Sequence, residues 1–104
     1  MKTITLLYFS AIVLLTPNLP EPSSNCSWDG IYLSGRVQFV DAFPDIRIQF
    51  VSSFPDLRVK WVGHSPDACG EWQEVSSFPD IRIQVVNSFP DLRIQEVNSF
   101  PGVN

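Results

Sequence analysis

The sequence predicts a small all-β domain of short strands and Phe-Pro-Asp turns, with the whole arrangement duplicated in tandem. A phrase with an eleven-residue period, Ser/Ala-Phe-Pro-Asp-Ile/Leu-Arg-Ile/Val, occurs in near-identical copies at 42–48, 53–59, 77–83 and 88–94. The residues after each Pro-Asp alternate between apolar and polar, which is the period of a half-buried strand. No stretch after Cys26 shows a helical period of useful length.

One unit shows how the phrase predicts a turn followed by a strand. Pro55 fixes its own φ, Asp56 can cap the turn, and the proline favours an extended backbone at Phe54. Leu57 to Trp61 then alternates apolar with charged residues. We expect the phenylalanine of each repeat to hold its turn against the core; these are Phe43, Phe54, Phe78, Phe89 and Phe100.

The same alternation predicts three further strands. Ile46, Ile48 and Phe50 share one face of the first, and the pattern recurs at 81–85 and 92–94. Eleven residues hold one strand and one tight turn, whereas a solenoid coil needs about twenty. Periodicity alone therefore indicates an unknotted antiparallel meander or small barrel.

A longer repeat contains the shorter one. Residues 35–69 and 70–104 align without gaps, and nineteen of the thirty-five positions are identical. Each half holds about three strand–turn units, of which the third is altered at 63–70. The duplication predicts a pseudo-twofold domain.

Residues 1–24 are predicted to be a signal peptide followed by a Pro-rich spacer, which leaves 25–104 as the folded domain. Lys2 precedes the apolar run Ile4 to Leu15, and twelve residues are too few to span a bilayer. We place cleavage near Ser23-Ser24; a lipid-modified Cys26 or a buried N-terminal element are the weaker alternatives. The predicted location is secreted or periplasmic, with membrane contact only through this segment.

The two cysteines, Cys26 and Cys69, are expected to form a disulfide, as an isolated pair in an exported chain usually does. On the chain-entropy model such a bridge stabilises by about 4 kcal/mol. Two thiols and the single histidine fall short of a zinc ligand set, so we expect no metal and no cofactor.

Two further motifs accompany the repeat: Cys26–Gly30 reads Cys-Ser-Trp-Asp-Gly and Cys69–Gln73 reads Cys-Gly-Glu-Trp-Gln. With the eleven-residue phrase, they make the chain resemble the septoil knot domain family. The resemblance implies a small all-β fold whose backbone forms a seven-crossing torus knot, and it implies no biochemical activity. The chain departs from the pattern at His64-Ser65, where the repeat phenylalanine is missing, and at Gly102, where the aspartate is missing.

Aspartate and arginine are spaced by two in each copy of the phrase, so they share a strand face and can form surface ion pairs. Such pairs are usually a solvated ladder worth about 0–1 kcal/mol each. The alternative is a guanidinium array that binds a polyanion or a glycan carboxylate; its members are Arg47, Arg58, Arg82 and Arg93. The net charge of −4 disfavours nucleic acid and anionic membrane as partners.

The aromatic residues divide into two groups. Trp61 is in phase with the apolar face of its strand, and Trp72 belongs to the central Cys-Gly motif, so both are assigned to the core. Trp28 and Tyr32 lie outside the repeats and are the better candidates for a binding surface.

The altered junction 64–72 is the candidate for catalysis, because His64, Ser65 and Asp67 are the three residue types of a hydrolase triad. No oxyanion-hole motif accompanies them, and residues this close seldom converge on one point. The sequence therefore favours an exported, stable, non-enzymatic domain with a structural or binding role and a glycan or surface protein as partner. An enzyme or enzyme inhibitor acting at 64–72 is the alternative.

Overall fold

The computed structural model describes residues 25–103, and every regular element in that range is a β-strand. The all-β prediction is thereby confirmed. The predicted signal peptide and spacer, 1–24, lie outside the described residues.

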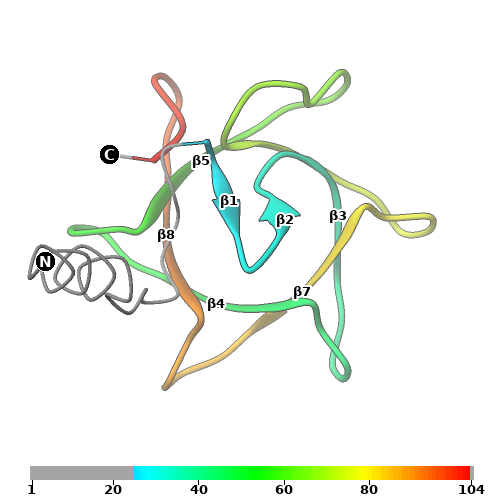
Figure 1. Ribbon diagram of the computed structural model, residues 1–104, viewed down its shortest axis with the longest axis vertical. Coiled ribbons are helices and arrows are strands. Elements are labelled where there is room, and N and C mark those ends of the chain that lie inside the picture. Colours follow the sequence, from blue (N-terminus) through cyan, green and yellow to red (C-terminus); the bar gives the residue numbers. More distant parts are fainter. Residues whose placement is uncertain (1–24, 104) are drawn as a thin grey trace, which may run out of the picture.

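Six strands form a closed barrel around which short loops project outward (Figure 1). They are β3 (Gly35–Phe39), β4 (Ile46–Phe50), β5 (Leu57–Trp61), β6 (Glu71–Glu74), β7 (Ile81–Val85) and β8 (Leu92–Glu96). All neighbours in the barrel are parallel, so the antiparallel pairing expected from periodicity was wrong.

The two copies of the duplication interleave around the barrel. Its strand order is β3-β6-β5-β8-β4-β7, so each strand of the first copy lies between two strands of the second. The chain therefore passes around the same axis twice, and the second pass fills the gaps left by the first.

Each six-residue loop carries the chain over a strand of the other copy. Phe39 at the end of β3 and Ile46 at the start of β4 pair with the same residue, Ile83, from opposite sides of β7. The loop 40–45 between them hydrogen-bonds to β7 at both of its ends and runs on the outside of the barrel (Figure 1). We call such a segment a crossing loop.

The register shows five crossing loops in the described residues. The loop 51–56 crosses β8 at Ile94, and those of the second copy cross β3, β4 and β5 in turn; their residues are 75–80, 86–91 and 97–102. Each crossing loop carries the chain to the next strand of its own copy in the same direction, so every strand runs parallel to its neighbours from the other copy. These six-residue loops are shorter than the dozen or more residues of a usual parallel crossover. This double winding is the kind of path that the family resemblance implies.

The first and third residues of the barrel strands fill the core, except in β6, where the second residue, Trp72, does so. Ile46, Ile48 and their equivalents are fully buried, as the alternation predicts, whereas the fifth residues Phe50 and Val85 are more than one-third exposed. Trp72 is fully buried, and Trp61 packs against it at a ring-centroid distance of 5.8 Å. The core prediction is confirmed for Trp72, whereas Trp61 is only partly buried and packs against the core.

A hairpin of β1 (Ser27–Trp28) and β2 (Ile31–Tyr32) lies within the ring outline in Figure 1. Asp29 and Gly30 both have positive φ, as a two-residue type I′ turn requires. Trp28 is only 9% exposed and belongs to the barrel's core cluster. Its predicted surface role was therefore wrong, because the hairpin directs this ring inward.

The predicted disulfide between Cys26 and Cys69 is confirmed, with a Cα–Cα distance of 5.8 Å. It ties the hairpin to the junction between the two copies. Gly70 follows immediately, and a β-carbon there would collide with the Arg58 carbonyl oxygen and the Gly102 nitrogen. The junction therefore requires glycine at this position.

Replacing both cysteines with serine should lower the free energy of unfolding by about 4 kcal/mol, because the bridge closes a span of 43 residues in the unfolded chain. Denaturant titration followed by tryptophan fluorescence measures the loss. Wild-type protein under reducing conditions is the control and should match the variant. Equal midpoints for the variant and the oxidised wild type would contradict the prediction.

Candidate binding surface

The aspartate of the repeat attaches each crossing loop to the strand beneath it. Asp80 donates its backbone N–H to the Arg36 carbonyl, and its Oδ2 atom accepts the Arg36 backbone N–H, both at 2.8 Å. We call this two-point contact the clamp. It provides hydrogen-bond partners for the backbone N–H and C=O of Arg36 and holds the loop against the crossed strand.

The clamp recurs with the same geometry at three other loops; the pairs are Asp45 with Arg82, Asp56 with Arg93, and Asp91 with Arg47. At the fifth loop Gly102 takes the aspartate's place, and its backbone exchanges two hydrogen bonds with Arg58. The sequence suggested pairing within each unit. The hydrogen bonds of the four aspartates instead go to the other copy, because each loop lies over that copy's strand.

A glutamine holds the other end of four of the five crossing loops. Gln38 donates its side-chain amide to the Ser76 carbonyl at 2.9 Å, and Gln84 donates to the Asp41 carbonyl at the same distance. Gln49 and Gln95 do the same at 3.2 Å. The polar residues of the repeat thus hold the crossing loops in place.

The four predicted arginines lie one on each of four neighbouring strands, β5, β8, β4 and β7. Arg47, Arg82 and Arg93 are exposed and Arg58 is partly buried. Arg93 forms an ion pair with Asp56 at 3.6 Å, and an arginine that the sequence reasoning missed, Arg36, pairs with Asp80 at 3.5 Å. Exposed pairs of this kind contribute little to stability.

The clamp also affects the protonation of the Asp80 carboxyl group. The pKa of Asp80 is lowered from its ordinary value, chiefly because the carboxylate accepts the Arg36 backbone N–H. Partial burial opposes this shift, and the hydrogen bond and charge of the Arg36 side chain add to it. The clamp therefore favours the ionised aspartate.

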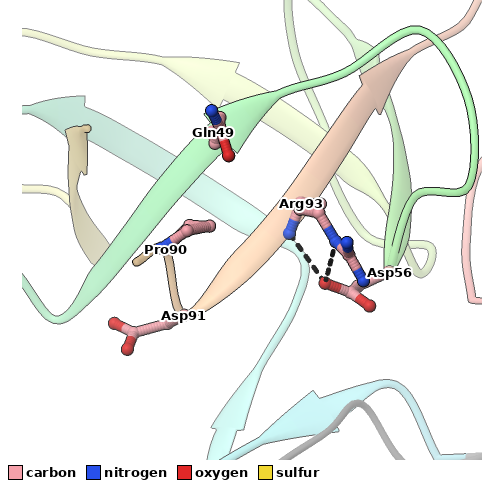
Figure 2. Close-up of a pocket in the computed structure, with 5 residues that line it drawn as sticks. All are labelled: Gln49, Asp56, Pro90, Asp91 and Arg93. Atoms are coloured by element: carbon pink, nitrogen blue, oxygen red, sulfur yellow. Dashed lines mark hydrogen bonds and ion pairs between the residues drawn. The ribbon is translucent and has the colours of Figure 1, made fainter. Parts of the chain in front are cut away.

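A pocket of about 350 Å³ lies where two crossing loops approach each other over β4 and β8 (Figure 2). Its lining residues are Gln49, Asp56, Pro90, Asp91 and Arg93. Figure 2 shows the Arg93 guanidinium beside the Asp56 carboxylate, with Pro90 and Asp91 across from them. The pocket is therefore lined by amide, carboxylate and guanidinium groups and is open to solvent.

The repeat phenylalanines are not core residues, contrary to the sequence-based expectation. Phe43, Phe54, Phe78, Phe89 and Phe100 are between 85% and 92% exposed. Their φ angles lie between 53° and 56°, so they adopt the left-handed conformation and not the extended one. The loop must reverse its direction sharply over the crossed strand, and this overrides the preference imposed by the following proline.

Ser65 occupies the equivalent position in the remaining loop, thirty-five residues before Phe100, and its φ is 51°. The backbone therefore takes the same conformation without a phenylalanine. The turn therefore does not require a phenylalanine side chain at this position. The thirty-five-residue alignment was the sequence signal that could have identified Ser65 as this equivalent.

The other predicted site residues lie on the surface. Tyr32 is 51% exposed and remains available on the surface. His64, Ser65 and Asp67 are all exposed, and the backbone N–H of Asp67 donates to the carbonyl of Ser65. No group of three histidine, cysteine or acidic residues within 25–103 could hold a metal ion.

These features define a class: a closed parallel barrel in which two copies interleave and cross each other under clamped loops. The chain belongs to the septoil knot domain family, since the model of the 7(1) septoil knot domain matches residues 30–104. Comparison with curated proteins gives no match.

Replacing Asp80 with asparagine should destabilise the domain by about 1 kcal/mol at neutral pH, since the negative charge of a half-exposed hydrogen-bond acceptor is lost. The folded-state pKa is lowered, so this stabilisation is present above the unfolded-state pKa and is lost as the pH falls through the folded one. The difference from wild type should therefore shrink between about pH 5 and pH 2. Denaturation at several pH values measures it, with Asp41→Asn as control. A difference that does not change with pH would contradict the clamp's electrostatic role.

Replacing Phe89 with glycine should leave the stability unchanged or raise it, because the ring is exposed and the left-handed backbone costs a residue with a β-carbon about 1–2 kcal/mol. Ile94→Ala is the matched core variant and should cost about 2–5 kcal/mol. Thermal unfolding compares them. A loss of similar size in both would show that the phenylalanine packs.

Proposed function

We propose that this protein is an exported, non-enzymatic binding domain that contacts its partner through the crossing loops. The repeated barrel is the scaffold, and the phenylalanines at the loops are the contact residues. Its location would be the cell surface or the periplasm.

The observation that carries this proposal is the exposure of the five phenylalanines. The apolar strand residues of the repeat fill the core, the aspartates clamp the loops, and the glutamines hold the loop carbonyls. The phenylalanine is a large apolar side chain that is turned to solvent in every copy, in a conformation that disfavours it. Aromatic side chains, phenylalanine included, are enriched at protein interfaces relative to the rest of the surface.

Two features support export. A disulfide persists in oxidising compartments and is rare in the cytosol, and the chain begins with the apolar run described above. Within residues 25–103, no helix is long and apolar enough to cross a membrane.

The non-enzymatic assignment is supported by the junction. The three triad-type residues lie within four positions of one exposed loop, without a surrounding scaffold to converge them. A broad hydrolase assay comparing wild type with His64→Ala tests the alternative. Activity that depends on His64 would overturn the assignment.

Replacing all five phenylalanines with serine, the residue found at position 65, should abolish retention on isolated cell envelopes while the fold is kept. Co-sedimentation measures retention, and circular dichroism verifies the fold. Ser65→Ala is the control and should bind like wild type. Equal retention of the quintuple variant would refute the role of the phenylalanines.

A further inference from the structure

The pocket in Figure 2 lies between two crossing loops, so a bound molecule would contact both. Asp56 ends the loop 51–56, and Pro90 and Asp91 end the loop 86–91. Phe54 and Phe89 lie one or two residues before these lining residues. A ligand in the pocket would therefore be flanked by two exposed aromatic segments.

The pocket offers hydrogen-bond donors and acceptors side by side. Asp56 and Asp91 each use the Oδ2 atom in a clamp, and the hydrogen bonds of the described residues do not involve their Oδ1 atoms. Gln49 uses its amide nitrogen on the Asn87 carbonyl, which leaves its oxygen as an acceptor, and the Arg93 guanidinium supplies donors. A hydroxyl group, which both donates and accepts, matches this combination.

The charge of the pocket selects against anions. Two carboxylates and one guanidinium line it, and the chain as a whole carries a net charge of −4. A phosphate, sulfate or uronate would meet this excess of negative charge. A neutral, hydroxyl-rich ligand is favoured.

The lining set is repeated. The register that pairs Gln49 with Arg93 also pairs Gln38 with Arg82 and Gln84 with Arg47. The same five residue types recur at the equivalent register positions; the two further sets are Gln38, Asp45, Pro79, Asp80 and Arg82, and Gln84, Asp91, Pro44, Asp45 and Arg47. The surface therefore presents three chemically equivalent sites.

The loops that separate these sites point in different directions around the barrel (Figure 1). A flat surface such as a bilayer cannot contact all of them at once. A flexible polymer of identical units can reach several, and its repeated weak contacts add through effective concentration.

We propose that the three sites bind a neutral polysaccharide, with sugar hydroxyls on the Gln, Asp and Arg side chains and sugar C–H faces against the neighbouring phenylalanine rings. This assignment rests on the proposed function and names its partner class.

The test is affinity electrophoresis and isothermal titration of the protein, expressed from the full-length sequence, with a neutral β-glucan, a mannan and a chito-oligosaccharide. Polygalacturonate, heparin and phosphatidylcholine vesicles are the comparison arms. Wild type should bind at least one neutral polymer, with little dependence on salt. The triple variant Q38A/Q49A/Q84A should bind it about tenfold or more weakly, as loss of multivalent contact predicts.

Gln73→Ala is the matched control. Gln73 also donates to a loop carbonyl, that of Gly63, but in the loop that lacks phenylalanine. This variant should bind within about twofold of wild type, since it removes a loop hydrogen bond without altering the three sites. Circular dichroism at the assay temperature verifies that both variants are folded.

Absence of binding to every neutral polymer, equal binding to polygalacturonate, or equal affinities of the triple variant and Gln73→Ala would each overturn the polysaccharide assignment. Envelope retention that still needs the phenylalanines, but is directed to lipid or protein, would reject the polysaccharide and leave the proposed function standing. Retention that does not need them would reject both.

Discussion

The clamp between each crossing loop and the strand beneath it is the interaction on which the rest of the structure depends. A loop that passes over a strand must pair the backbone N–H and C=O groups that the crossing would otherwise bury without partners. The aspartate supplies these partners by exchanging two hydrogen bonds with one arginine backbone, as Asp80 does with Arg36. With the loops attached, each strand of one copy is held between two strands of the other, and the apolar residues close the core.

The interleaving also resolves a difficulty that near-identical strands create. Repeated strands can slip or exchange, because several registers satisfy the same pattern. Here each loop crosses one defined strand, and the hairpin anchored by Cys26–Cys69 breaks the symmetry at the junction. Gly70 marks the same place, because the backbones of Arg58 and Gly102 approach it too closely for a side chain. The repetition that makes one scaffold also makes several equivalent surface sites, which favours a partner that is itself repeated.

Part of this architecture could be predicted from sequence and part could not. The alternation at Ile46 and Ile48 placed both in the core because a strand's period is local information. The direction of pairing was wrong because parallel and antiparallel neighbours give similar patterns at this length. Trp28 was misplaced for a related reason: a hairpin outside the repeats has no periodic reference to show which side faces the barrel. Phe54 was misplaced because aromatic character favours burial, whereas its left-handed backbone turns it outward.

The sequence by itself determined that the domain is all-β, built from two copies of three strand–turn units, and of the septoil knot family, because period and motif are properties of the chain. It also identified the cysteine pair. Only the tertiary structure decided which residue the aspartates bind, that the copies interleave, and that the phenylalanines face solvent. Those facts depend on contacts between residues 37 or 44 positions apart, such as Asp56 with Arg93 and Asp80 with Arg36. No local pattern specifies them, since any of several near-identical units would satisfy the same short-range preferences.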